Sequence, residues 1–122
     1  MPTDTLTDAS LRAQKLRLMI FDVDGILTDG GLRYGAEGEL IKTFNVLDGQ
    51  GIKLLQQSGV AAAIISARQS AIVARRASDL GIKVLMQGVH GPSLPRWKSR
   101  LTARLGRKNP AKAGLLFCSW TR

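Results

Sequence analysis

The 122-residue chain has one cysteine and no long hydrophobic run. Cys118 cannot form an internal disulfide, and a lone cysteine without histidine and carboxylate partners is more often inert than nucleophilic, so we assign it no role. Its apolar stretches are short, such as Val60–Ile65, whereas a membrane-spanning helix needs about 20 apolar residues. The N-terminus carries Asp4 and Asp8 and lacks the positive start and apolar centre of a signal peptide. We therefore expect a cytoplasmic protein without a membrane partner.

Acidic residues are absent after Asp79. All nine Asp and Glu residues lie before residue 90 together with ten Lys and Arg, whereas residues 91–122 hold eight Lys and Arg and no acid. The net charge of +9 is therefore concentrated in a basic tail that follows a balanced domain. The Trp-containing basic stretch at 96–112 leaves nucleic-acid binding open as an alternative. Because the excess charge is confined to the tail, we expect the protein not to bind nucleic acid.

Apolar runs alternate with helical patterns through residues 16–87. Runs that end at turn residues predict buried strands, and apolar spacing that ends before a glycine predicts helices. Strands that alternate with helices predict an α/β fold with a Rossmann-like, doubly wound parallel sheet, here with a β-hairpin after the first strand. The expected elements are a strand at 16–21, hairpin strands at 30–34 and 40–46, a helix at 49–58, a strand at 60–66, a helix at 69–80, a strand at 82–87 and a further short strand within 113–120.

Asp22 and Asp24 directly follow the first expected strand, in the segment Asp-Val-Asp-Gly. The carboxyl edge of a parallel sheet is where such folds bind ligands. One carboxylate at this place can attack phosphorus while the other gives a proton to the leaving group and later takes one from water. A hard cation such as Mg²⁺ would screen the charge between carboxylate and phosphate. The alternatives are a plain Asp-Gly turn and a receiver-type acidic pocket, which fits less well because a hairpin follows the acids.

Three stretches together resemble one known family. Phe21–Gly30 resembles the first motif of the haloacid dehalogenase phosphatases, Ile41–Lys53 is similar to the substrate loop of a small cap-less group within them, and Ala63–Ser70 is similar to their second motif. The resemblance runs from about residue 11 to His90. It implies a Mg²⁺-dependent phosphatase of a sugar-acid phosphate, with a homotetramer as the family's assembly.

The resemblance also implies roles for single residues. Asp22 would be the nucleophile and a metal ligand, and Asp24 would be the acid and base, contact substrate and bind the metal through its backbone oxygen. Ser66 would hydrogen-bond the transferring phosphoryl group. On sequence alone, Ser66 could equally be the N-cap of the next helix, and both roles can hold at once. The remaining positions that contact an anionic sugar acid in the family are Asn45, Asp48, Gly49, Lys53, Arg68 and Arg76. For Lys53 and Arg76 a solvated helix face is the alternative.

The sequence departs from the family in several places. Leu47 stands where many members carry Arg, and Ala67 stands where they usually carry Gly. Pro92 occupies the position of a phosphate-facing Lys, and the later metal-binding acid has no counterpart. We therefore expect a truncated phosphatase domain at 11–90, incomplete at its C-terminus, which exposes one side of the sheet.

The tail at 91–122 is expected to be unrelated to the family and poorly ordered. Residues 91–99 can be encoded so that another reading frame gives Thr-Lys-Pro-Ala-Ala-Leu-Glu-Glu, which is similar to the Lys-containing segment of the family. A shift of frame near His90 is thus the leading hypothesis for the tail, and we expect this polypeptide to be inactive. A non-enzymatic remnant remains the main alternative to a phosphatase.

Overall fold

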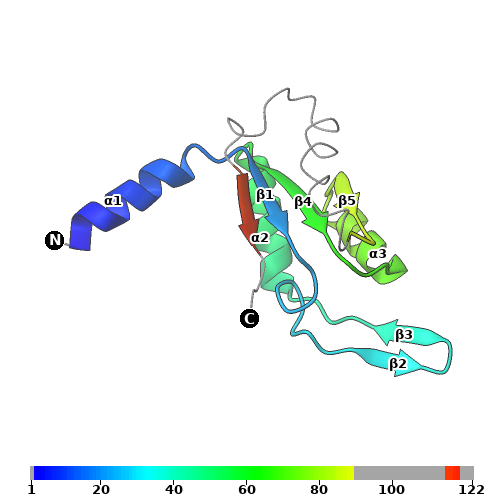
Figure 1. Ribbon diagram of the computed structural model, residues 1–122. Helices are drawn as coiled ribbons and strands as arrows, with labels where there is room; N and C mark the ends of the chain where they lie inside the picture. The colour runs from blue at the N-terminus through cyan, green and yellow to red at the C-terminus, as the bar shows by residue number, and fades with distance from the viewer. Residues whose placement is uncertain (1, 90–114, 119–122) are drawn as a thin grey trace.

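The computed structural model describes the backbone of residues 2–89 and 115–118 and the side chains of residues 8–89. In this part of the chain, parallel strands form one sheet in the order β5-β4-β1-β6 (Figure 1). The sheet confirms the predicted α/β class. Its strands are β1 (Leu18–Phe21), β4 (Ala61–Ile65), β5 (Val84–Met86) and β6 (Leu115–Cys118).

The sheet buries side chains on both of its faces. Successive residues of a strand point to opposite faces, so Leu18 and Ile20 of β1 contribute to one apolar cluster and Phe21 to the other. Strands that are buried on both sides read as continuous apolar runs, which is why β1, β4 and β5 were recognisable in the sequence. The core thus fixes the carboxyl ends of these strands along one edge of the sheet.

Two helices pack against the same face of the sheet. Helix α2 (Val46–Gln57) contributes Ile52 to the cluster that contains Phe21, and helix α3 (Ala71–Asp79) contributes Val73 and Ala77. Helix α2 begins three residues before the predicted start, because Asn45 caps it. The predicted strand at 40–46 is therefore too long, because β3 ends at Ile41 and residue 46 already belongs to α2.

The hairpin extends from the body of the molecule (Figure 1). Its strands β2 (Arg33–Gly35) and β3 (Gly38–Ile41) pair antiparallel, with a register shift between Arg33 and Tyr34. The strands are shorter than predicted, and Gly38 has a φ of 124°, which disfavours any side chain at this turn. The prediction of a β-hairpin after the first strand is therefore confirmed.

Two elements lie wholly or mostly outside the predicted domain at 11–90. Helix α1 (Pro2–Ala13) was not anticipated, and it extends away from the sheet (Figure 1). Strand β6 falls within the expected strand at 113–120 and pairs in parallel with β1 on the side opposite β4. We expected one side of the sheet to be exposed, and this expectation is wrong for the edge of β1, which β6 covers. Most of the tail lies outside the described residues.

Among the helices that the structure describes, none is long and apolar enough to cross a membrane.

Candidate active site

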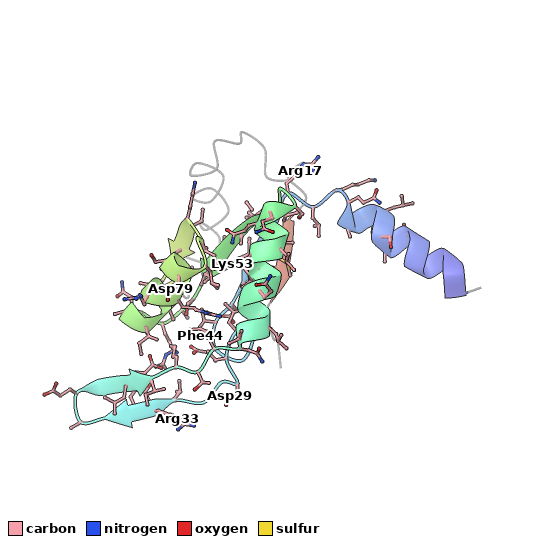
Figure 2. The ribbon with its side chains drawn as sticks, turned by 180° about the vertical axis from the view of Figure 1, so that it is seen from behind. Arg17, Asp29, Arg33, Phe44, Lys53 and Asp79 are labelled. Atoms are coloured by element: carbon pink, nitrogen blue, oxygen red, sulfur yellow. The ribbon has the colours of Figure 1, made fainter. Side chains whose placement is uncertain are left out.

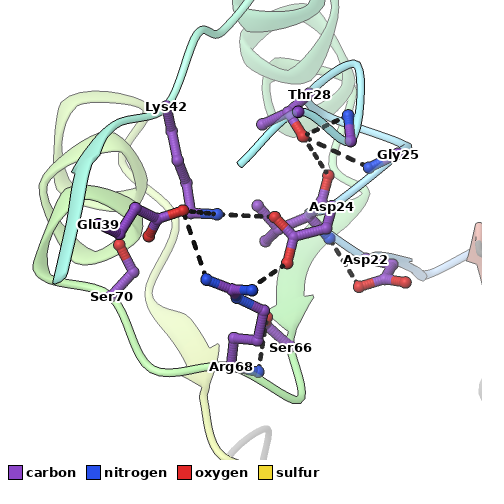
Figure 3. A network of polar contacts seen from close by, with 12 residues as sticks. Asp22, Asp24, Gly25, Thr28, Glu39, Lys42, Ser66, Arg68 and Ser70 are labelled. Atoms are coloured by element: carbon purple, nitrogen blue, oxygen red, sulfur yellow. Dashed lines mark hydrogen bonds and ion pairs between the residues drawn. The ribbon is translucent and has the colours of Figure 1, made fainter. Parts of the chain in front are cut away.

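The loop after β1 turns tightly around one backbone oxygen. The oxygen of Val23 accepts hydrogen bonds from the N–H groups of residues 26, 27 and 28, at 3.2, 2.9 and 3.1 Å. Gly25 has a φ of 82°, a left-handed conformation that favours glycine. Oγ1 of Thr28 accepts hydrogen bonds from the N–H groups of Gly25 and Gly30 (Figure 3). The Asp-Gly turn of the motif is thus a rigid loop that presents Asp22 and Asp24 at the edge of the sheet.

Asp24 lies in a cluster of charged side chains from three parts of the chain (Figure 3). Nζ of Lys42, which follows β3, lies 2.7 Å from Oδ1 of Asp24. Nε of Arg68, which follows β4, lies 3.6 Å from Oδ2 of the same carboxylate. Oε1 of Glu39 lies 2.9 Å from Nζ of Lys42 and 3.6 Å from Nη2 of Arg68. Two cations therefore alternate with two carboxylates beside the loop.

The two cations of this cluster differ in burial. The side chain of Lys42 is 2% exposed, whereas that of Arg68 is 37% exposed. Burial lowers the pKa of Lys42, but its hydrogen bond to Asp24 and its charge interactions with Asp24 and Glu39 outweigh this effect, so the pKa lies above its ordinary value of 10.5. Nη2 of Arg68 donates a hydrogen bond of 2.8 Å to the hydroxyl of Tyr34. Lys42 is thus a buried ammonium and Arg68 a more accessible guanidinium.

Ser66 lies at the carboxyl end of β4, next to the cluster. Its side chain is buried, and its Oγ accepts a hydrogen bond of 3.3 Å from the backbone N–H of Arg68. Its backbone N–H donates to the oxygen of Met86, so the hydroxyl is fixed between β4 and β5. The N-cap of α3 is Ser70, four residues later. The reading of Ser66 as a helix N-cap is therefore wrong, while its expected place at the end of the strand is the observed one.

A second group of predicted residues surrounds the start of α2. Oδ1 of Asn45 accepts a hydrogen bond of 2.7 Å from the N–H of Leu47. Nη2 of Arg76 donates to the backbone oxygen of Asn45 at 3.1 Å, and the guanidinium lies 5.4 Å from the ring centre of Phe44. A Cβ added to Gly49 would lie 2.5 Å from Nη2 of Arg76. Arg76 therefore packs across this loop, where the absence of a side chain at Gly49 makes room for it.

The remaining predicted residues, Asp48 and Lys53, lie on α2. Asp48 and Asn45 line a surface hollow together with Thr28 and Asp29. Lys53 is exposed midway along α2, as its label in Figure 2 shows. The structure thus brings Asp24, Ser66 and Arg68 together beside Asp22, and places the residues at the start of α2 in a separate group. Of the described site residues, Lys53 is the one that joins neither group.

Three residues of the charged cluster were not predicted from the sequence. Lys42 and Glu39 carry opposite charges three positions apart at the end of a hairpin strand, and Tyr34 lies on the facing strand. This pattern suggests an ion pair within the hairpin. It does not indicate contact with Asp24, which is 18 residues from Lys42 along the chain.

The loop after β1 provides few protein ligands for a metal ion. The Asp22 carboxylate and the backbone oxygen of Asp24 are suitable donors, whereas the Asp24 side chain is paired with Lys42. In the described ranges, no three His, Cys, Asp or Glu side chains are grouped closely enough to hold a metal. Mg²⁺ commonly uses one or two carboxylates and completes its shell with water and substrate phosphate. The residues present therefore fit Mg²⁺ bound in this way, and they do not form a site built from protein ligands alone.

Several solved structures that superpose on this chain are phosphatases. No family model matches the chain. The cobalt-bound deoxy-D-mannose-octulosonate 8-phosphate phosphatase from Haemophilus influenzae superposes with a TM-score of 0.76 at 38% identity, over 87% of this chain and 59% of that one. The 3-deoxy-D-manno-octulosonate 8-phosphate phosphatase from Moraxella catarrhalis, in complex with magnesium, phosphate and KDO, gives a TM-score of 0.74 at 40% identity, over 88% and 59%.

The sequence comparison agrees with these superpositions. The phosphatase KdsC from Haemophilus influenzae is 48% identical over 77 residues, which cover 63% of this chain and 43% of the relative. The fold, the Asp-x-Asp loop and these similarities are features that the chain shares with hydrolases of the haloacid dehalogenase superfamily. Among these hydrolases, the chain is homologous to the 3-deoxy-D-manno-octulosonate 8-phosphate phosphatases. The chain spans less than half the length of the curated relatives that it matches.

Proposed function

We propose that the domain at 11–90 is part of a phosphomonoesterase that hydrolyses 3-deoxy-D-manno-octulosonate 8-phosphate to the free sugar acid and phosphate, in lipopolysaccharide precursor synthesis in the cytoplasm. One observation carries the proposal. Asp22 and Asp24 lie on a rigid loop at the carboxyl edge of the sheet, with Ser66 and Arg68 on the neighbouring strand end. Homology to KdsC supports the choice of substrate.

The reaction consists of two displacements at phosphorus. A carboxylate oxygen of Asp22 attacks phosphorus, the bond to the sugar oxygen breaks, and Asp24 gives its proton to that oxygen. Water then attacks the aspartyl-phosphate, Asp24 takes a proton from this water, and Asp22 is regenerated as phosphate leaves. Ser66 would donate a hydrogen bond to the phosphoryl group. Bound Mg²⁺, on the carboxylate of Asp22 and the backbone oxygen of Asp24, would supply positive charge that screens phosphate from carboxylate.

The substrate carboxylate would bind to cationic side chains. Arg68 is the best placed, because it lies beside Asp24 and is partly exposed. A guanidinium suits a carboxylate because its fork donates two parallel hydrogen bonds. Asn45, Asp48, Gly49, Lys53 and Arg76 remain proposed substrate contacts, and a homotetramer remains the proposed assembly of the family. An acylneuraminate phosphate is the alternative substrate, since Leu47 replaces an Arg that many members carry.

Comparing sugar-acid phosphates with neutral sugar phosphates tests the substrate class, on a variant whose residues after Val89 follow the alternative reading frame. The proposal expects kcat/KM to be higher for the acids, and Arg68→Ala to reduce this preference, because the positive charge that faces the carboxylate is lost. Arg75→Ala is the matched control, since Arg75 is exposed on α3 and paired with Asp79. Equal efficiency on both substrate sets contradicts a sugar-acid substrate.

The polypeptide with this sequence is proposed to be inactive by itself. Pro92 replaces the phosphate-facing Lys, and no acid follows Asp79. Electrostatic groups of this kind are worth about 100- to 1,000-fold each in rate, so two losses leave little turnover. Measuring Mg²⁺-dependent phosphate release and a thermal melt on this sequence tests the point. Robust turnover with a sharp transition contradicts both the inactivity and the shifted reading frame.

Resequencing the gene across the codons for residues 89–99 tests the origin of the tail. The proposal expects a one-base change that restores a Lys-containing helix start and a later acid. If the sequence is confirmed as given, the tail is a genuine extension, and β6 is then a strand that the extension adds to the sheet beside β1. A non-enzymatic protein is the second candidate function in that case.

A further inference from the structure

We propose that Lys42 is a positioning residue which, together with Glu39, fixes the carboxylate of Asp24 and makes the hairpin part of the active site. The inference rests on the proposed role of Asp24 as acid and base. Figure 3 shows the Lys42 side chain extending from the end of β3 to the loop after β1, with Nζ between the two carboxylates. Because the ammonium contacts both carboxylates, it can hold the Asp24 side chain in one position.

Lys42 contacts Asp24 more closely than Arg68 does. Its Nζ donates a hydrogen bond of 2.7 Å to Oδ1 of Asp24, a length typical of a charge-assisted bond. Nε of Arg68 lies 3.6 Å from Oδ2, which is beyond hydrogen-bond length. Lys42 is also nearly fully buried, whereas Arg68 is accessible to a ligand. Lys42 therefore sets the position of the carboxylate, and Arg68 can turn toward a substrate without releasing it.

Glu39 keeps the Lys42 ammonium in place from the other side. Its Oε1 is buried without a hydrogen bond of good geometry, and it lies 2.9 Å from Nζ of Lys42. A lysine ammonium has three donors and a flexible stem, so a second carboxylate restricts its direction. The exposed side chains of Tyr34, Leu40 and Ile41 show how little else of the hairpin is buried. The ion pairs of Lys42 thus join an otherwise exposed hairpin to the catalytic loop.

The geometry distinguishes the two oxygens of Asp24. Oδ1 accepts the hydrogen bond from Lys42, so its orientation is fixed. Oδ2 faces Arg68 across a longer gap. A general acid must present one oxygen within hydrogen-bond reach of the leaving group. Oδ2 is therefore the oxygen that exchanges the proton, while Oδ1 maintains the alignment.

Heteronuclear NMR on the full chain, labelled with ¹⁵N and ¹³C in lysine and aspartate, tests this inference. We expect the Lys42 ammonium to give an ordered signal with a coupling across the hydrogen bond to Cγ of Asp24. Lys83, which is exposed, is the internal control and should show no such coupling. In Glu39→Gln the coupling from Lys42 to Asp24 should fall at least about two-fold, because the ammonium loses its second charged partner.

The outcomes separate a contact with Asp24 from a contact that is confined to the hairpin. A Lys42 ammonium that is coupled to Glu39 but not to Asp24 would stabilise the hairpin alone, and this result overturns the inference. An absent ordered signal in the unaltered chain, or a coupling unchanged by Glu39→Gln, overturns it equally. The measurement reports the resting carboxylate and needs no turnover. Failure of the phosphatase assay therefore removes the acid and base role of Asp24 but leaves the measured coupling intact, and loss of the coupling leaves the phosphatase proposal intact.

Discussion

The parallel sheet and the hairpin are built on opposite principles. The sheet is stabilised by apolar side chains buried on both faces, with Ile20 fully buried in its centre. The hairpin exposes its large side chains, and Ile41 is 51% exposed. Its side-chain links to the rest of the molecule are polar, from Lys42 to Asp24 and from Tyr34 and Glu39 to Arg68. The comparison teaches that the sheet fixes where Asp24 lies, whereas the hairpin fixes how its carboxylate is oriented.

The largest effect should come from the same substitution made in both regions. Ile20→Ala removes three buried methyl or methylene groups from β1 and should lower the free energy of unfolding by about 3 kcal/mol. Ile41→Ala, at an exposed position of the hairpin, should change it by less than about 0.5 kcal/mol. Urea denaturation of both variants measures the difference. Equal losses would mean that the hairpin is buried in solution, for example by another copy of the chain.

Removing the Lys42 charge should have the next largest effect. Lys42→Met leaves Asp24 and Glu39 close together without their shared cation, and breaking a fully buried pair costs about 3–5 kcal/mol. Because Asp24 is partly exposed, we expect about 2 kcal/mol in a thermal or urea melt. Lys83→Met is the matched control, since Lys83 is exposed, and it should be nearly neutral. A neutral Lys42→Met contradicts the buried ion pair.

Two glycines of α2 offer a smaller contrast. Gly51 has open space where a Cβ would be placed, so Gly51→Ala should stabilise the helix by about 0.5–1 kcal/mol. A Cβ at Gly49 would displace the guanidinium of Arg76, which offsets the same gain in helix propensity. We therefore expect Gly49→Ala to be about 1 kcal/mol less stable than Gly51→Ala. Identical stabilities would show that Arg76 does not pack on Gly49 in solution.

The smallest effect concerns pH. The pKa of Lys42 is raised in the folded chain, so the stability that its charge contributes is complete below the unfolded value of 10.5 and is lost as the pH rises through the folded value. The difference in stability between the unaltered chain and Lys42→Met should stay constant between about pH 6 and about pH 9, and shrink above about pH 10.5. Denaturation at several pH values checks this. A difference that already shrinks near neutral pH contradicts the direction of the shift.

The sequence predicted the sheet better than it predicted the site. Strands β1, β4 and β5 were found because strands that are buried on both faces leave apolar runs that end at turn residues. The start of α2 was misplaced, because the alternation up to Val46 reads as a strand until Asn45 is recognised as a cap.

The charged cluster was predicted in part. Asp22, Asp24, Ser66 and Arg68 follow two neighbouring strands, and parallel strands bring their carboxyl ends to one edge. Lys42 belongs to the hairpin, whose direction relative to the sheet depends on long-range contacts. Local pattern carries no information about such contacts, so the link between Lys42 and Asp24 became visible in the structure alone.

The most direct test of the account is phosphate release by a variant whose residues after Val89 follow the alternative reading frame, with and without Asp22→Asn. The assay uses 3-deoxy-D-manno-octulosonate 8-phosphate as the substrate, in the presence of Mg²⁺. The account predicts turnover by this variant, and a loss of more than about 1,000-fold in kcat when Asp22 is replaced, because the proposed nucleophile is lost. An unchanged melting temperature confirms that the substitution leaves the fold intact. Near-normal turnover by a folded Asp22→Asn variant would contradict the assigned nucleophile and, with it, the central claim.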